Sequence, residues 1–348
     1  MIARDPTNTA GSARLAGTDS TATFAGRPIA AASTAGRGSD STARARIKTS
    51  SSRTWLPPAA ALLLLGVAIF LPNINTSKTT YDYLVVFDIT QSMNVEDYDL
   101  NGTSVSRLAF AREAVRRNLR NLPCGSRVGW GIFTEYRTLL LLAPIEVCEN
   151  YNDLLASLDR IDGCMRWGNA SEISKGLYWA LRGARDVGGK PRVLFLTDGQ
   201  EAPPVEGEGL PLFDDIERGE ISGWLIGVGG YTPRPIPRTD ADARPIGFWH
   251  ADEVVQRDTG GSSREQLSSV REPYLRQLAN RVGLDYLHLN DADSIRTAML
   301  HPAFAEKRAA PTDFAWLPGA MALVALIIGY SRALPWRISY TIRGRSSR

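Results

Sequence analysis

The chain has 348 residues, of which 22% are charged and 43% hydrophobic, so most of it can build one large domain or two small ones. Its formal net charge of +3 is too small to indicate a nucleic-acid-binding protein. Three cysteines and three histidines, with no CxxC pair or Cys/His cluster, exclude a recognisable zinc motif.

The N-terminal region, residues 1–53, is rich in Ala, Ser, Thr, Gly and Arg and has few large apolar residues. Such a segment cannot bury enough apolar surface to offset its chain entropy, so we expect a disordered basic tail. A gene start placed too early would give the same composition, and this interpretation stays open beside the first.

Two uncharged apolar runs, at residues 55–74 and 314–331, flank the middle of the chain. A bilayer core about 30 Å thick needs roughly 20 apolar residues as a helix, so we predict two transmembrane helices. A cleaved signal peptide is the alternative for the first run, and a buried core helix for the second. Basic residues lie outside both runs, including a basic tail at 332–348. The positive-inside rule then puts both termini in the cytoplasm and residues 79–312 in the periplasm of a bacterial inner membrane.

Strand-like and helix-like segments alternate in the middle region. The predicted strands cover residues 83–87, 127–134, 138–145, 192–196, 221–228 and 285–289. The predicted helices cover residues 106–119, 151–161, 172–185, 273–282 and 292–300. This order predicts an α/β fold with a Rossmann-like, doubly wound, mostly parallel sheet. The second and third strands are expected to form a hairpin with one antiparallel edge strand, and residues 229–269 form a Pro- and Gly-rich insertion.

Polar side chains follow two of the predicted strands. Asp88 ends the first, with Thr90 and Ser92 directly after it, and Asp198 follows the strand at 192–196. Ser171 stands just before a helix that begins at the same edge of the sheet, where ligands of such folds bind. Two carboxylates and three hydroxyls are hard oxygen donors, which suit Mg²⁺, Mn²⁺ or Ca²⁺.

Three segments carry a resemblance to a known family: DITQS at residues 88–92, SEISKGL at 171–177 and LFLTDG at 194–199. In this order they resemble the motifs of the metal-ion-dependent adhesion site in von Willebrand factor type A (VWA) domains. The resemblance extends over about residues 80–300. It implies the VWA fold and a binding function without catalysis.

The resemblance also implies the site residues. Asp88, Thr90 and Ser92 correspond to the first motif, Ser171 to the second and Asp198 to the third. Thr90 stands where the family has Ser, and Ser171 where it has Thr, so each position keeps its hydroxyl. The family binds Mg²⁺ (or Mn²⁺ or Ca²⁺) at this site, and a protein partner supplies an Asp or Glu as the last ligand.

A narrower resemblance concerns membrane-anchored bacterial VWA proteins. It rests on the two flanking apolar runs, on VEDYD after the first motif, and on IGVGG followed by GFWHADEVVQ. Such proteins accompany MoxR-type AAA ATPases and act in the assembly or maturation of periplasmic enzymes. Similarity to the accessory proteins of methanol oxidation implies calcium insertion into a quinoprotein dehydrogenase.

Other functions fit parts of the same pattern. Haloacid-dehalogenase-like phosphatases also end a strand in Asp, and Asp88 would be their nucleophile, but Thr90 stands where their general acid is expected. A Ser nucleophile would need a neighbouring base, and no histidine stands in a recognisable triad context. A structural VWA domain with a vestigial metal site is the remaining alternative.

The cysteines allow a prediction from the order of the strands. Cys124 precedes the strand that runs toward the metal edge, and Cys148 follows the strand that runs back, so both are expected at the opposite edge. Cys164 follows the next helix and is expected at the metal edge. We therefore predict a Cys124–Cys148 disulfide and a free Cys164.

Three features next to the site have two interpretations each. Glu96, Asp97 and Asp99 are predicted to lie in a solvated loop, with a second ion site or a contact surface as the alternative. Trp167 either contacts a partner at the rim or packs under its loop. The insertion at 229–269 is either a contact surface or a solvated flap.

Overall fold

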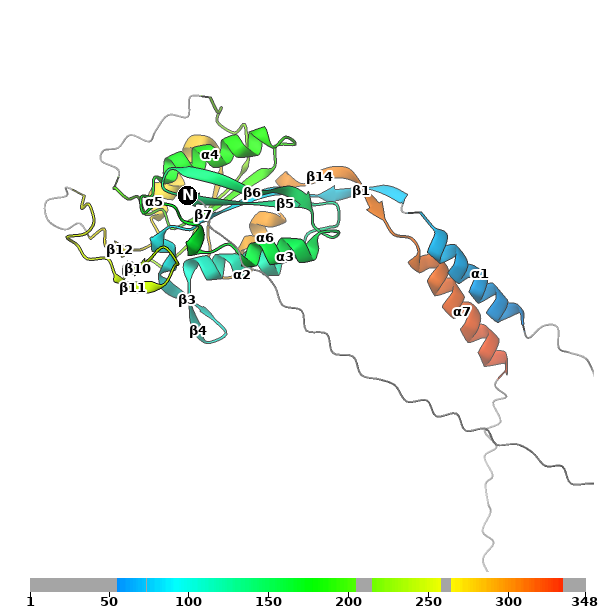
Figure 1. Ribbon diagram of the computed structural model, residues 1–348. Helices are drawn as coiled ribbons and strands as arrows, with labels where there is room; N and C mark the ends of the chain where they lie inside the picture. The colour runs from blue at the N-terminus through cyan, green and yellow to red at the C-terminus, as the bar shows by residue number, and fades with distance from the viewer. Residues whose placement is uncertain (1–54, 73, 205–214, 258–263, 334–348) are drawn as a thin grey trace, which may run out of the picture. The chain divides into compact units, whose positions relative to one another are not determined.

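The computed structural model describes residues 55–72, 74–204, 215–257 and 264–333 (Figure 1). The predicted tail at residues 1–53 lies outside the described residues, as does all but the beginning of the predicted tail at 332–348.

A six-stranded sheet has the strand order β13–β8–β7–β2–β5–β6. The strands are β2 (Asp82–Asp88), β5 (Arg127–Thr134), β6 (Arg137–Glu146), β7 (Arg192–Thr197), β8 (Gly223–Gly227) and β13 (Asp285–His288). All neighbours are parallel except β5 and β6, so the predicted sheet with one antiparallel edge strand is confirmed. Counted from β6, the strands follow the chain order 3-2-1-4-5-6, which reverses between β2 and β7.

Helices cover both faces of this sheet (Figure 1). The first face carries α2 (Arg107–Leu119), α3 (Tyr151–Asp159) and α6 (Ser294–Met299), and the second carries α4 (Ile173–Asp186) and α5 (Glu272–Val282). All residues of β2 are buried, because Tyr83, Val85 and Phe87 enter the first core while Leu84 and Val86 enter the second. This two-sided burial explains the continuous apolar run of the strand.

Several shorter elements were not predicted. They are β1 (Ile74–Thr80), β3 (Glu96–Leu100), β4 (Thr103–Ser106), β9 (Arg234–Pro235), β10 (Pro237–Thr239), β11 (Pro245–Phe248), β12 (Leu267–Ser268), β14 (Glu306–Thr312), η1 (Gln91–Asn94), η2 (Gly163–Met165) and η3 (Pro302–Phe304). β1 pairs with β14 and β3 with β4, both antiparallel. These strands form two-stranded ribbons outside the six-stranded sheet, although Tyr98, Leu100 and Val105 of β3 and β4 pack against its first core.

The prediction of transmembrane helices at 55–74 and 314–331 is wrong for the described structure. Among the described residues, no helix is both long enough and apolar enough to cross a membrane. The first run forms α1 (Leu56–Phe70), a helix of 15 residues that is about 22 Å long. The helix ends there because Leu71 has an extended backbone and β1 begins at Ile74. The second forms α7 (Trp316–Ala333), an 18-residue helix that includes Pro318 and Arg332.

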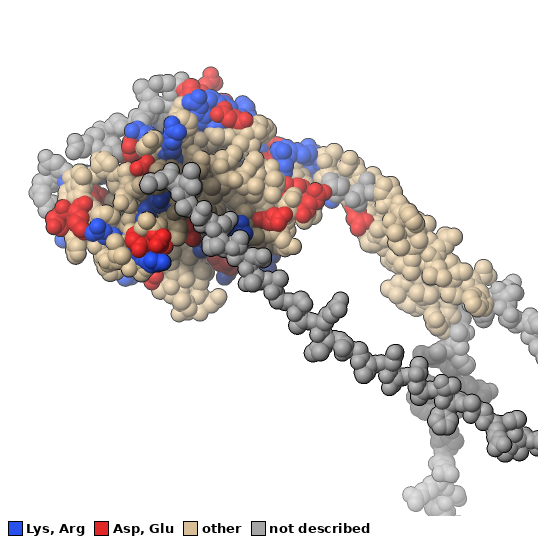
Figure 2. All heavy atoms as spheres, viewed as in Figure 1, with Lys and Arg blue, Asp and Glu red and all other residues tan. Residues whose placement is uncertain are grey.

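The helices α1 and α7 run side by side (Figure 1). Gly329 of α7 lies close enough to Pro57 of α1 that a Cβ at this glycine would meet the proline ring at 2.6 Å. The outward side chains of the pair are apolar, and Figure 2 shows it almost without charge, whereas both signs of charge are mixed over the visible face of the sheet domain.

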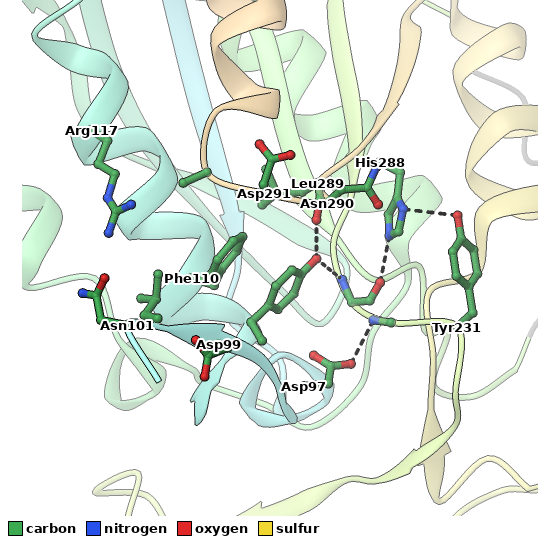
Figure 3. Close-up of a pocket in the computed structure, with 15 residues that line it drawn as sticks. Asp97, Asp99, Asn101, Phe110, Arg117, Tyr231, His288, Leu289, Asn290 and Asp291 are labelled. Carbon is green, nitrogen blue, oxygen red and sulfur yellow. Dashed lines mark hydrogen bonds between the residues drawn. The ribbon is translucent and has the colours of Figure 1, made fainter. Parts of the chain in front are cut away.

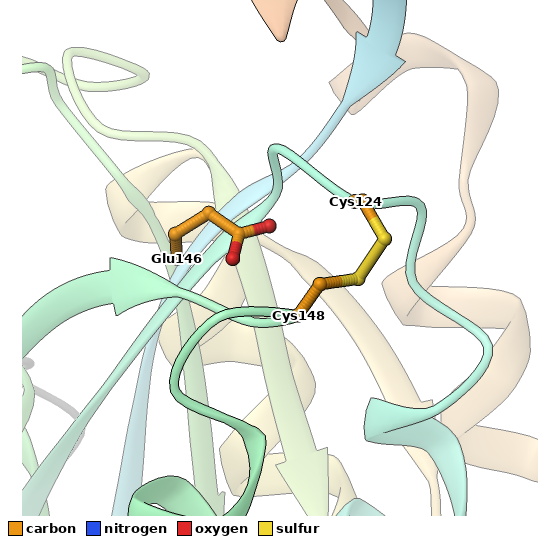
Figure 4. Close-up of side chains that lie close together, drawn as sticks. All are labelled: Cys124, Glu146 and Cys148. Atoms are coloured by element: carbon orange, nitrogen blue, oxygen red, sulfur yellow. A yellow bond between two sulfur atoms is a disulfide. The ribbon is translucent and has the colours of Figure 1, made fainter. Parts of the chain in front are cut away.

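The predicted disulfide between Cys124 and Cys148 is confirmed, and Cys164 is free and exposed. The bridge joins the loop before β5 to the loop after β6 (Figure 4). Glu146 lies beside it and accepts a hydrogen bond of 2.6 Å from the backbone N–H of Gly125. Since bridged sulfurs offer no thiolate, this group of two cysteines and a glutamate is not a metal site.

We predict that the double substitution Cys124→Ser and Cys148→Ser lowers the free energy of unfolding by about 3 kcal/mol, because the bridge closes a loop of 24 residues. Urea denaturation of the oxidised protein measures this loss, and reduction of the wild type should reproduce it. Cys164→Ser is the control and should leave the stability unchanged. Unchanged stability of the double variant, or a bridge to Cys164 in non-reducing peptide mapping, would contradict the assignment.

Candidate metal site

The two predicted carboxylates lie where the strand order reverses. Asp88 is the last residue of β2 and Asp198 directly follows β7, the neighbouring strand, and both are fully buried. The Thr197 hydroxyl donates a hydrogen bond of 2.7 Å to Asp88 Oδ2 across the two strands. The sheet therefore brings together two residues that lie more than a hundred positions apart.

The loop after β2 turns its hydroxyls back toward Asp88. Both the backbone N–H and the hydroxyl of Thr90 donate to Asp88 Oδ1, at 2.9 and 2.6 Å. The hydroxyl oxygens of Thr90 and Ser92 lie 3.2 Å apart. Neighbouring ligands of a Mg²⁺ octahedron are separated by about 3 Å when the metal–oxygen bonds are near 2.1 Å, so this spacing fits two ligands of one ion.

Ser171 reaches the same site from the segment before α4. Its backbone N–H donates to Ala202 O at 2.7 Å, and Ala202 N–H donates back to Ser171 O at 2.8 Å, which fixes it beside the loop that follows Asp198. Ser171 Oγ is buried and has no hydrogen-bond partner in the described part of the chain. Several other buried side-chain atoms of the described residues also lack a partner, but among the residues that line the cavity at this site Ser171 alone does, and a bound cation would satisfy its oxygen.

A cavity of about 280 Å³ joins the three hydroxyl residues. Its lining comprises Thr90, Gln91, Ser92, Asn169, Ser171, Gln200, Glu201, Ala202, Pro203, Pro204, Ile236, Trp249, Glu253, Val254, Val255 and Glu265. Asp88 and Asp198 are not part of this lining. The three hydroxyl residues thus line the cavity. The carboxylate of Asp88 does not line it, but accepts a hydrogen bond from the hydroxyl of Thr90, which does. The donor set and the orphaned Ser171 Oγ fit a hard divalent cation.

Sequence reasoning missed Arg107, the first residue of α2, which is fully buried beside the site. Its guanidinium donates to Asp198 Oδ2 and to Asp97 Oδ2, both at 2.7 Å, and to Ser268 Oγ at 2.7 Å. Ser268 Oγ in turn donates to Asp198 Oδ2 at 2.7 Å. One signal was available: a basic residue at a helix N-terminus opposes the helix dipole, and therefore indicates a specific acidic partner.

The prediction of a solvated acidic loop is wrong, because its three residues lie in the strand β3, and Asp97 is not solvated either. Its side chain is only 6% exposed and is paired with Arg107, whereas Glu96 and Asp99 are exposed as expected. Trp167 is 47% exposed, which favours its interpretation as a residue at the rim.

Glu201 is a second residue that the sequence reasoning missed. It lines the cavity, and its carboxylate accepts hydrogen bonds from Ile173 N–H, at 3.1 Å, and from the Tyr274 hydroxyl. Burial raises its pKa to about 7. Its position three residues after Asp198, at the same strand end, was the available signal.

The electrostatics of the two aspartates favour a cation. Burial, and then the charge of Asp198, raise the pKa of Asp88 to about 7, although hydrogen bonds from Thr90 and Thr197 act in the opposite direction. A carboxyl with such a pKa holds a proton where a cation would otherwise balance its charge. Arg107 supplies one positive charge, but it contacts Asp198 and not Asp88.

Comparison of the sequence with protein-family models and with curated proteins gave no match. Among solved structures, an aerotolerance-related membrane protein from Bacteroides fragilis is 18% identical, with 63% of this chain and 96% of that chain covered and a TM-score of 0.44. An uncharacterized membrane-spanning protein from Vibrio fischeri is 20% identical over 62% of this chain and 94% of that chain, with a TM-score of 0.27. The ArnB paralog VWA2 from Sulfolobus acidocaldarius is 15% identical over 65% of this chain and 45% of that chain, with a TM-score of 0.35. At TM-scores below 0.5, these likenesses do not identify a family.

We predict that Arg107→Leu lowers the free energy of unfolding by about 3–5 kcal/mol, because it leaves two buried carboxylates without their cation. Chemical denaturation measures the loss. The matched control is Arg117→Leu on the same helix, whose side chain is 39% exposed and pairs with Glu113, so its cost should stay below about 1 kcal/mol. Equal effects of the two substitutions would show that the buried ion pairs contribute nothing specific.

We predict a pH-dependent stability of the metal-free protein. In the folded state the Asp88 carboxyl keeps its proton up to about pH 7, whereas in the unfolded state it loses the proton near its ordinary pKa of 3.8. The contribution of this group to the free energy of unfolding is therefore fully present below about pH 4 and is lost as the pH rises to 7. With a chelator present, wild type should therefore lose thermal stability relative to Asp88→Asn between about pH 4 and 7. Parallel melting-temperature profiles of the two proteins would contradict this.

Proposed function

We propose that the chain carries a VWA-like domain that binds a divalent cation and, through it, a protein partner. The observation that carries the proposal is the orphaned, buried Ser171 Oγ on the cavity that Thr90 and Ser92 also line. The strand order, which reverses between Asp88 and Asp198, supports it, because ligands of doubly wound sheets bind at this point.

The position of each residue decides what it would contribute to ion binding. Thr90, Ser92 and Ser171 offer hydroxyl oxygens to the ion, and Asp88 and Asp198 supply negative charge from behind them. The bound ion, Mg²⁺ or alternatively Mn²⁺ or Ca²⁺, would attract an Asp or Glu of the partner. Because Arg107 offsets the charge of Asp198, the protein compensates the ion only in part, and this favours an additional carboxylate from outside.

The burial of Asp88 supports a binding function over a phosphatase that uses this residue as its nucleophile. Its side chain is fully buried, and each of its oxygens already accepts a hydrogen bond, from Thr90 or from Thr197. A nucleophile must reach its substrate, whereas a charge behind hydroxyl ligands need not. A domain with a vestigial metal site is the second alternative, and metal titration separates it from our proposal.

The disulfide supports an oxidising compartment such as the bacterial periplasm. In that compartment, the resemblance to membrane-anchored bacterial VWA proteins favours a partner that is an enzyme under assembly or maturation. A quinoprotein dehydrogenase that acquires its calcium with the help of a MoxR-type AAA ATPase system is the form of this proposal that the narrower resemblance supports.

The first test is metal binding by calorimetric titration of the chelator-treated chain with Mg²⁺. Ser171→Ala should weaken binding by at least about tenfold, because it removes a ligand. It should barely change the stability without metal, since its hydroxyl has no hydrogen-bond partner among the described residues. The control Ser104→Ala, on the exposed strand β4, should bind Mg²⁺ as wild type does.

The second test is affinity capture of envelope proteins on the wild-type chain with Mg²⁺, on the wild-type chain with a chelator, and on Ser171→Ala. A partner retained only by wild type with Mg²⁺ would support metal-dependent binding and identify the system. A partner retained equally in all three arms, or a wild-type chain that does not bind a divalent cation, would mean that the site is vestigial.

A further inference from the structure

The insertion at residues 229–269 supplies one wall of the candidate metal-site cavity. Ile236, Trp249, Val254 and other lining residues come from this segment, and the metal-site hydroxyls come from the other side. Whatever enters the cavity therefore contacts the insertion as well as the hydroxyls.

The beginning of the insertion is held by β3 and β13 (Figure 3). Gly229 N–H donates to the Tyr98 hydroxyl at 2.8 Å, and Gly230 N–H donates to Asp97 Oδ2 at 2.9 Å. His288 Nε2 lies 2.8 Å from Gly229 O. These bonds fix the chain where it leaves β8.

The middle of the insertion is bonded to the metal-site loop itself. Gln91, which stands between Thr90 and Ser92, accepts hydrogen bonds at Oε1 from Thr239 N–H, at 3.1 Å, and from Trp249 Nε1, at 2.9 Å. Its Nε2 donates to Asn169 Oδ1 at 2.8 Å, in the segment that precedes Ser171. One buried side chain thus joins the insertion to both hydroxyl-bearing loops.

The end of the insertion is held next to Asp198. Glu265 accepts hydrogen bonds from Gln200, at 2.8 Å, and from Arg271, at 3.0 Å. Ser268 donates to Asp198 at 2.7 Å. These anchors at its beginning, middle and end favour the interpretation of the described part of the insertion as a contact surface, although much of it is exposed.

The size and chemistry of the cavity limit its occupant. At about 30 Å³ per water molecule, the 280 Å³ cavity has room for roughly nine water molecules. An acidic side chain and part of a neighbouring side chain fit into this volume. The insertion wall is apolar at Ile236, Trp249 and Val254. The cavity also has three glutamates, Glu201, Glu253 and Glu265. Arg238 pairs with Glu253 and Arg271 with Glu265, so the apolar wall, more than the charge of the glutamates, sets the preference for the neighbours.

We propose that the site selects an exposed peptide segment in which a single acidic residue is adjacent to large apolar residues. The acidic residue binds the ion, and the wall of Ile236, Trp249 and Val254 contacts its neighbours. The inference rests on the proposed metal-dependent function and adds the sequence preference of the partner. A preference for apolar over acidic neighbours is opposite to what the charge of the cation alone would produce.

The test uses the full 348-residue chain and three fluorescein-labelled, amidated pentapeptides with centres Leu-Asp-Leu, Gly-Asp-Gly and Asp-Asp-Asp, each flanked by glycines. Fluorescence anisotropy with Mg²⁺ gives the dissociation constants. We expect Leu-Asp-Leu to bind at least about tenfold more tightly than either of the others, because it buries apolar side chains without adding charge.

Two matched variants test the wall. Val255→Asn changes an exposed residue of the cavity lining to a neutral polar one, and Ile246→Asn makes the same change at a similarly exposed residue of the insertion outside the lining. The first should abolish the preference for Leu-Asp-Leu, the second should not, and neither should alter the Mg²⁺ affinity of the chain.

Failure of this inference is distinct from failure of the proposed function. If Mg²⁺ binds but Gly-Asp-Gly or Asp-Asp-Asp binds as tightly as Leu-Asp-Leu, or none of the peptides binds, the selectivity is overturned and the metal site stands. If the chain does not bind Mg²⁺ in calorimetry, the proposed function is overturned, and the inference with it.

Discussion

The burial of like charges at the point where the strand order reverses is the constraint on which the rest of the site depends. Asp88 and Asp198 end neighbouring strands and are both fully buried. Two such carboxylates are unfavourable unless hydrogen bonds and positive charge surround them. The loops around this edge of the sheet supply both: hydroxyl and N–H donors at Asp88, and the Arg107 guanidinium at Asp198.

Arg107 extends this compensation to distant parts of the chain. It contacts Asp97 at the start of the β3–β4 hairpin and Ser268 at the end of the insertion, while it also pairs with Asp198. A single buried side chain therefore connects three segments that are separate in sequence. Because a buried guanidinium must keep all its partners, the hairpin and the insertion are held next to the candidate metal site.

The insertion forms one wall of the cavity at the candidate metal site. This cavity is bounded by Trp249 and its apolar neighbours on one side and by the hydroxyl residues on the other. The bonds from Gln91 to Thr239 and Trp249 hold that wall against the metal-site loop. Specificity and ion binding would then reside in one connected structure.

Much of this could be predicted from the sequence because it is local. The continuous apolar run of β2, the antiparallel hairpin of β5 and β6, and the Cys124–Cys148 pair follow from strand patterns and from the order of the elements. The polar residues at the strand ends were identified for the same reason, since parallel strands bring their carboxyl ends to one edge.

The tertiary structure alone decided the features that depend on contacts between distant segments. No local pattern indicates that Arg107 pairs with Asp198, that Ser171 Oγ is left without a partner in the described chain, or that Trp249 lies over the metal-site loop. The apolar runs at the two ends indicated helices, but where α1 stops was decided by β1, which begins at Ile74 to pair with β14. Hydrophobic pattern reports which residues avoid water, whereas helix ends, ion pairs and cavity walls depend on which partner each residue meets after folding.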